Sequence, residues 1–237
     1  MKLTDARILF VDDEPILLEL FENWLRMIGC DKVFTAANGK DALSLLQLES
    51  FDLLVSDVRM PVMDGITLVR CLSEVAKPLP SIIFVSGFSD FDRREMYALG
   101  VEAFLIKPFD RAELLSRMEK AVAERSTLWN TEMDSTPLQS LFIKANRMDK
   151  TASLNTIGLG RGGFSIYAPE PLSPGKATFR LVLAEYAIEI AGQGYVRWSS
   201  QTDRKAGVEL AFLNPECHAL LAGAIASACP RSFIPGS

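Results

Sequence analysis

The sequence predicts a protein of mixed class, α/β followed by all-β: a doubly wound parallel sheet and then a small antiparallel β-barrel with a C-terminal helix. Short apolar runs alternate with amphipathic helical patterns over about the first 125 residues. Beyond residue 150, apolar and polar residues alternate between glycines, as in antiparallel strands. With 237 residues, 49% of them hydrophobic, the chain is long enough for two cores. We therefore expect domains at 1–125 and 151–237, joined by a linker at 126–150 that contains a short helix.

Five strand-helix units account for the first part of the chain. The expected strands are 6–11, 33–36, 53–57, 81–86 and 103–106, and the expected helices are 15–28, 39–49, 65–76, 90–99 and 110–127. Pro15 suits the first turn of a helix, and Gly29 suits the position just after its end. Because a helix connects each strand to the next, the strands are expected to be parallel and to form one sheet.

Three carboxylates stand where two of these strands end. Asp12 and Asp13 follow the first strand, and Asp57 is the last residue of the third. Parallel sheets bind their ligands at the carboxyl edge, so we expect the three acids to meet there. Because three such charges repel one another, a divalent cation that prefers oxygen ligands, such as Mg²⁺, is the expected partner.

Residues from about 5 to 125 resemble the receiver domain of two-component response regulators in the content, order and spacing of these motifs. The resemblance implies the flavodoxin-like strand order 2-1-3-4-5. It also implies that Asp57 accepts a phosphoryl group from a histidine kinase or a phosphotransfer protein. Asp12, Asp13, Asp57 and the backbone carbonyl of Arg59 would then surround Mg²⁺.

Two further residues are expected at the same edge as Asp57, because Ser86 ends the fourth strand and Lys107 follows the fifth. An acyl phosphate needs its negative charge balanced. Lys107 supplies a positive charge, and the Ser86 hydroxyl can hydrogen-bond a phosphoryl oxygen. The resemblance further implies a cis peptide between Lys107 and Pro108. It gives Phe104 the role of an aromatic switch that turns inward when Ser86 moves toward the phosphoryl group.

The second part is expected to contain short antiparallel strands and one terminal helix. The expected strands are 152–157, 163–167, 177–184, 187–199 with an interruption at Gly192 or Gly194, and 206–212, and the helix begins after Asn214 and reaches about Ser227. The short helix of the linker is expected because Leu138, Leu141, Phe142 and Ala145 keep helical spacing.

Glycine is concentrated in the run Gly158–Gly163, which has the spacing Gly-x-Gly-x-x-Gly of dinucleotide-binding loops. That motif acts between a strand and a helix, whereas here a strand is expected to follow, so we reject it. The run, with 194–198 and 206–212, instead resembles a PilZ domain, a small barrel that commonly binds cyclic-di-GMP.

The candidate cyclic-di-GMP residues are few. The PilZ family uses an Arg-x-x-x-Arg segment and an Asp/Asn-x-Ser-x-x-Gly turn. Here Arg147 is the only upstream arginine, because Thr151 stands four residues later. Gly158 and Gly160 occupy the Asp/Asn and Ser places of the turn, and only Gly163 agrees with the pattern. Lysine substitutes poorly for arginine in bidentate roles, so the ligand site resembles a degraded one.

The distribution of charge argues against a DNA-binding output domain, and the cysteine spacing argues against a metal site or disulfides. Residues 1–130 carry 15 Lys and Arg against 21 Asp and Glu, a net charge of −6, whereas 131–237 carry 10 against 9, a net charge of +1. A nearly neutral second part lacks the basic patch of a DNA-binding domain, so DNA is not an expected partner. The cysteines show no metal-ligand spacing and are expected to be buried thiols in a reducing cytoplasm: Cys30, Cys71, Cys217 and Cys229. Neither a signal peptide nor a membrane anchor is expected.

These observations predict a cytoplasmic response regulator that signals through a PilZ-like output domain. The leading hypothesis makes that domain a non-enzymatic interaction module for an output protein, and a homodimer stays open. The alternative is an effector that binds cyclic-di-GMP and integrates it with phosphorylation. An enzymatic output is disfavoured because 131–237 contains no nucleophile-base pair, no metal cluster and no intact phosphate loop.

Overall fold

The computed structural model describes residues 1–74, 79–87, 91–130, 137, 139–149, 152–228 and 230–236. The chain divides into two units, which are described separately. The first unit comprises Met1–Phe91 and Val101–Ala123, and the second comprises Asp92–Gly100 and Glu124–Ser237. Among the described residues, no helix combines the length and the apolar character that crossing a bilayer requires.

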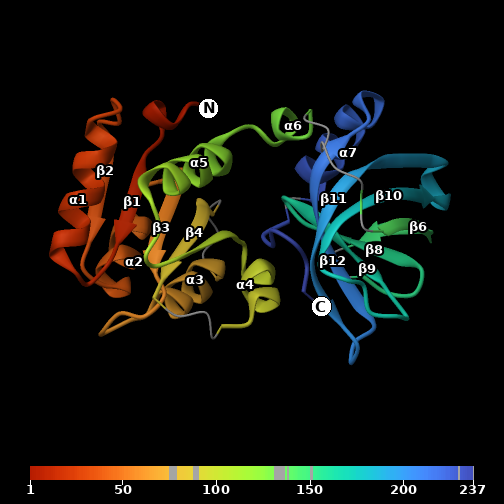
Figure 1. Ribbon diagram of the computed structural model, residues 1–237, viewed down its shortest axis with the longest axis horizontal. Coiled ribbons are helices and arrows are strands. Elements are labelled where there is room, and N and C mark those ends of the chain that lie inside the picture. The colour runs from red at the N-terminus through yellow and green to blue at the C-terminus, as the bar shows by residue number, and fades with distance from the viewer. Residues whose placement is uncertain are drawn as a thin grey trace. The chain divides into compact units, whose positions relative to one another are not determined.

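The first unit is built on a five-stranded parallel sheet with the strand order β2-β1-β3-β4-β5 (Figure 1). Its strands are β1 (Ile8–Val11), β2 (Val33–Ala36), β3 (Leu53–Asp57), β4 (Ser81–Ser86) and β5 (Val101–Ile106). The predicted parallel sheet and its strand order are confirmed. β1 and β3 lie at the centre of the sheet and are buried along their whole length, so their apolar runs are continuous.

Helices α1 and α5 cover one face of this sheet. Phe21 and Leu25 of α1, with Leu114 and Met118 of α5, share a buried cluster with Phe10 and other side chains of the central strands. Alternate strand residues point to the opposite face, where α2 and α3 lie in contact with each other. The helices of the first unit are α1 (Pro15–Arg26), α2 (Gly39–Leu48), α3 (Gly65–Ser73) and α5 (Arg111–Val122), preceded by the short 3₁₀ helix η1 (Leu3–Asp5). The helix α4 (Arg93–Leu99) lies between β4 and β5 in the sequence and belongs to the second unit.

Asparagine or aspartate side chains cap the N-termini of α2, α3, α4 and α5. Asn38, Asp64 and Asp110 are the N-caps of α2, α3 and α5, and each accepts a hydrogen bond from the backbone N–H three residues ahead. The sequence prediction for the last helix is wrong at its end. α5 stops at Val122 because Ala123 has an extended backbone, and residues Arg125–Leu128 form a separate short helix, α6.

The second unit contains a seven-stranded sheet that curls on itself, in the order β6-β10-β11-β12-β9-β8-β7 (Figure 1). Its strands are β6 (Gln139–Ala145), β7 (Arg147–Asp149), β8 (Thr156–Leu159), β9 (Gly163–Tyr167), β10 (Gly175–Leu183), β11 (Ile188–Ser200) and β12 (Lys205–Leu213), with a 3₁₀ turn η2 (Ala184–Tyr186) and the helix α7 (Pro215–Ala228). The prediction of a purely antiparallel barrel is wrong, because β6 pairs with β10 and β7 with β8 in parallel.

The predicted linker helix around 138–145 is also wrong. Residues Gln139–Ala145 form the strand β6, in which burial alternates. Leu141 and Ile143 pack against the core of the second unit, while Phe142 is 60% exposed. The apolar residues of the segment 138–145 fit both a helical repeat and the alternation of a strand. The parallel pairing with β10 makes the segment 139–145 a strand. Leu138 lies outside the described residues.

The remaining elements of the second unit lie close to their predicted positions. β9 has the predicted bounds, and α7 begins directly after Asn214. β8 begins later than predicted, at Thr156. The predicted interruption near Gly194 is a shift of register with β12, and β11 continues through it. The described strands and α7 enclose a separate core, which includes Trp129, Phe164, Phe179, Leu183 and Val208.

Candidate functional site

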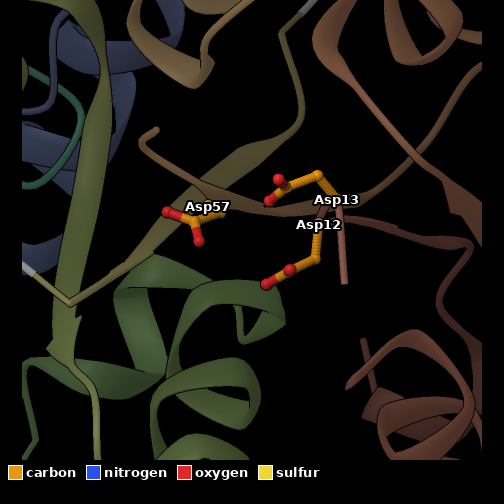
Figure 2. A group of neighbouring side chains, drawn as sticks. All are labelled: Asp12, Asp13 and Asp57. Atoms are coloured by element: carbon orange, nitrogen blue, oxygen red, sulfur yellow. The ribbon is translucent and has the colours of Figure 1, made fainter. Parts of the chain in front are cut away.

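Three carboxylates meet at the carboxyl edge of the parallel sheet (Figure 2). Asp12 and Asp13 directly follow β1, and Asp57 is the last residue of β3, its neighbour in the sheet. One carboxylate oxygen of each acid lies within 4.8 Å of the other two. Asp12 is 2% exposed and Asp57 8%, whereas Asp13 is exposed. The geometry thus brings together the three acids that the sequence predicted at this edge.

Lys107 lies between two of these acids. Its Nζ is 2.8 Å from Oδ2 of Asp12 and 2.8 Å from Oδ2 of Asp57. The residue follows β5, and its backbone N–H donates to the carbonyl of Ser86 over 2.8 Å. The Lys107–Pro108 peptide is cis, as predicted. A cation therefore bridges carboxylates that come from two different strand ends.

Burial and charge oppose each other in this cluster. Burial raises the pKa of the Asp12 carboxyl, and the hydrogen bond from Lys107 offsets only part of that rise. For Lys107, burial lowers the pKa of the ammonium group, but the hydrogen bonds to Asp12 and Asp57 outweigh it, so the pKa is raised. Lys107 consequently stays charged over the physiological range of pH.

Backbone groups complete the site. The N–H of Arg59 donates to Oδ1 of Asp57 over 3.0 Å, and the N–H of Glu14 donates to Oδ1 of Asp12 over 3.0 Å. Both oxygens of Asp57 are therefore engaged, one by a backbone donor and one by Lys107. The backbone of Arg59 thus contacts the Asp57 carboxylate, while a metal-ligand role for its carbonyl stays a prediction.

Two residues of the site escaped the sequence analysis. The Glu14 carboxylate lies 3.8 Å from Nζ of Lys107, a contact that its position next to the acid pair could have suggested. Gly65 begins α3, and a Cβ atom at this position would overlap the backbone carbonyl of Asp57. Glycine is therefore needed at position 65, where α3 passes close to the backbone of Asp57. This contact is visible only in the tertiary structure.

Ser86 lies at the edge of the sheet that carries the three acids, whereas Phe104 packs among aromatic side chains. Ser86 ends β4 beside β3 and is 1% exposed, so it lies at the predicted edge of the sheet. Phe104 belongs to β5 and stacks on Phe91, with ring centroids 5.0 Å apart. Its ring is half-buried among aromatic side chains, including Phe84 at 6.4 Å. The switch roles of both residues stay predictions.

The candidate ligand residues of the second unit are occupied by other contacts. The Arg147 guanidinium lies 3.5 Å from the Asp149 carboxylate, and its side chain is 54% exposed. Gly160 and Gly163 close the turn between β8 and β9 through a backbone hydrogen bond of 2.8 Å. A Cβ atom on Gly163 would overlap the carbonyl of Val208 in β12. Because a strand follows Gly163, the rejection of the dinucleotide fingerprint is confirmed.

Comparisons with known proteins agree on the identity of the first part. The family described as "Response regulator receiver domain" matches residues 8–119. A "Probable transcriptional regulator ycf27" of Cyanophora paradoxa is 35% identical over 146 residues, which cover 61% of this chain and 60% of the relative. The alkaline phosphatase synthesis transcriptional regulatory protein PhoP of Bacillus subtilis is 34% identical over 124 residues, covering 52% of this chain and 51% of PhoP. The chain thus spans about half to three fifths of these relatives.

Similar solved structures include receiver domains. TrrA of Thermotoga maritima, in complex with Mg²⁺ and BeF, has 30% identity and a TM-score of 0.44, and covers 51% of this chain and 99% of TrrA. The receiver domain of a sensor histidine kinase of Pseudomonas aeruginosa has a magnesium ion in its active site cleft. It has 28% identity and a TM-score of 0.46, and covers 50% of this chain and 98% of that one. The family match and the curated relatives establish that residues 8–119 are a response regulator receiver domain of the two-component type.

Proposed function

We propose that this chain is a response regulator that is phosphorylated on Asp57, with Mg²⁺ bound by Asp12, Asp13 and Asp57. The observation that carries the proposal is the cluster of three carboxylates within 4.8 Å, bridged by Lys107. Carboxylate oxygens are the ligands that Mg²⁺ prefers, so the residues fit this ion. The phosphodonor is a histidine kinase or a phosphotransfer protein.

Asp57 is the best nucleophile of the three acids. Asp12 has a side chain only 2% exposed and a raised pKa, so an incoming phosphoryl group cannot reach it easily. Asp13 is exposed and follows the strand rather than ending it. The Asp57 side chain is 11% exposed and held by hydrogen bonds from Arg59 and Lys107. This combination gives access together with a fixed orientation.

The reaction is a displacement at phosphorus. A carboxylate oxygen of Asp57 attacks, the bond from phosphorus to the donor nitrogen breaks, and its electron pair leaves with the imidazole of the phosphohistidine. Bound Mg²⁺ supplies positive charge for the phosphoryl oxygens. Lys107, already in hydrogen-bonding reach of Asp57, neutralises the new acyl phosphate, and the Ser86 hydroxyl donates to a phosphoryl oxygen. The backbone carbonyl of Arg59 would be a further ligand of Mg²⁺, and Phe104 would act as the switch.

Labelling with acetyl phosphate tests this assignment. We expect the full chain with Mg²⁺ to gain one acid-stable, base-labile phosphoryl group, which intact-mass spectrometry measures. Asp57→Asn should abolish the gain, because the amide is not a nucleophile. Asp31→Asn, which neutralises an exposed acid, is the control and should be labelled like the parent chain. Undiminished labelling of Asp57→Asn would remove Asp57 from its role.

We also propose that the second unit is a PilZ-like output domain that acts as a non-enzymatic interaction module. Two contacts support an interaction role over binding of cyclic-di-GMP. The Arg147 guanidinium is paired with Asp149, and the carbonyl of Phe233 lies where a side chain at Gly160 would have to be. The ligand chemistry expected of an arginine fork and a polar turn is therefore missing from these described residues.

Calorimetric titration of the full chain with cyclic-di-GMP distinguishes the two outputs. We expect no heat of binding, either in Mg²⁺ alone or with beryllofluoride added to mimic phosphorylated Asp57. The Arg147→Ala variant should give the same flat trace. If the chain binds cyclic-di-GMP with micromolar affinity and Arg147→Ala abolishes the binding, the interaction-module hypothesis is wrong. The second unit would then be an effector that binds cyclic-di-GMP.

A further inference from the structure

The C-terminal residues 231–236, here called the tail, lie against the turn between β8 and β9 and bend at Phe233 and Ile234. The backbone N–H groups of Arg161 and Gly162 donate to the carbonyls of Ser232 and Phe233, each over 2.9 Å. Phe233 is 2% exposed and Ile234 is fully buried. The tail thus binds in the way peptides bind to proteins, through main-chain hydrogen bonds and an aromatic and aliphatic anchor.

The glycines of this turn are explained by the tail. Cβ atoms built on Gly160 and Gly162 would overlap the carbonyl and the ring of Phe233, respectively. Neither glycine has a positive φ, so backbone conformation does not demand glycine at either position. Gly160 and Gly162 form a surface, here called the cradle, on which the tail lies so closely that a Cβ atom at either position would overlap it.

The tail has a second contact within the same unit. The N–H of Phe233 donates to the carbonyl of Tyr97 in α4 over 2.9 Å, and the two rings stack with centroids 6.0 Å apart. Nε of Arg94 donates to the carbonyl of Gly236 over 2.6 Å. Backbone groups on both sides of the tail are therefore engaged, and the side chains of Phe233, Ile234 and Pro235 are buried.

We propose that the tail is an intramolecular ligand that covers a peptide-binding cradle. The partner that the cradle fits is a segment of an output protein carrying an aromatic residue followed by an aliphatic one, because this is the chemistry the cradle already holds. The tail must leave before such a segment enters, so it acts as an autoinhibitory strap. This inference goes beyond phosphorylation of Asp57 and does not depend on it.

A peptide supplied in trans tests the proposal in the full chain. Phe233→Ala removes the anchor but leaves the cradle intact. A fluorescent peptide of residues 230–237 should bind this variant at least tenfold more tightly than the parent chain, whose cradle is filled. Phe142→Ala removes an exposed phenylalanine instead and should behave like the parent chain. Adding Gly162→Ala to Phe233→Ala should abolish the binding, because its Cβ occupies the place of the ring.

Binding of the peptide is followed by its fluorescence anisotropy. Equal affinity for the parent chain and for a folded Phe233→Ala variant would overturn the proposal. Unfolding of that variant, seen by circular dichroism, would overturn it as well, because the tail would then be part of the core.

A second measurement does not depend on Phe233→Ala. Gly162→Ala should expel the tail and speed tryptic cleavage after the exposed Arg231 at least tenfold. Gly223→Ala adds a Cβ in open space and is the control. Equal cleavage rates would count against a displaceable strap.

Discussion

At the scale of single residues, the buried carboxylate of Asp12 shows how the site is held together. Its side chain is 2% exposed, and a charge in that environment costs stability unless it is paired. Lys107 provides the pairing at 2.8 Å, but it is shared with Asp57. One cation thus serves two acids, which leaves net negative charge for a divalent ion to neutralise.

Asp12→Asn should stabilise the protein when no Mg²⁺ is present. Because burial raises the pKa of Asp12 in the folded state, the ionised carboxyl lowers the free energy of unfolding above that pKa. We expect a gain of about 1 kcal/mol at pH 7.5. The gain should shrink as pH falls through the raised pKa, where the parent carboxyl takes up its proton.

Urea unfolding in EDTA at pH 7.5 and at pH 4 measures this effect. Asp31→Asn provides the control, because Asp31 is exposed. A loss of stability at pH 7.5, or a gain that grows toward acid pH, would contradict the sign of the argument.

At the scale of elements, α5 depends on its N-cap. The Asp110 side chain accepts a hydrogen bond from the N–H of Glu113 over 2.7 Å. Asp110→Ala leaves that donor without its side-chain acceptor and should lower the free energy of unfolding by about 1 kcal/mol. Asp110→Asn keeps an acceptor and should lose less than half as much. Thermal unfolding followed by circular dichroism compares the two, and equal losses would mean that charge, not capping, matters here.

The strand β6 shows where local patterns mislead. Its apolar residues fit a helix and a strand equally well, and its partner β10 begins 30 residues after the end of β6, at Gly175. A pairing over that distance in sequence decides the element, and no window on the residues 139–145 contains it. The same reason explains why the parallel pairing of β6 with β10 was missed.

At the scale of the whole molecule, each unit has its own hydrophobic core. Leu183 is fully buried in the core of the second unit. Leu183→Ala should therefore destabilise that unit by about 2–5 kcal/mol. Phosphorylation of Asp57 by acetyl phosphate should keep its rate, because the acid cluster belongs to the first unit.

Hydrogen exchange with mass spectrometry checks this prediction. Exchange should quicken in β10 and β11 of Leu183→Ala while β1 and β3 keep their protection. Loss of labelling at Asp57, with equal loss of protection in β1, would mean that the two cores unfold together.

The sequence alone determined the five strand-helix units, their parallel order and the strand ends that carry Asp12, Asp13 and Asp57. These features depend on short apolar periods and on motif spacing, which are local properties of the chain. Only the tertiary structure decided that Lys107 bridges Asp12 and Asp57, that Gly65 must lack a side chain beside Asp57, and that β6 is a strand. It also showed why Gly160 and Gly162 are glycines, because the tail that approaches them is about 70 residues away in the sequence. Contacts of that kind depend on how distant segments meet, and no local pattern encodes them.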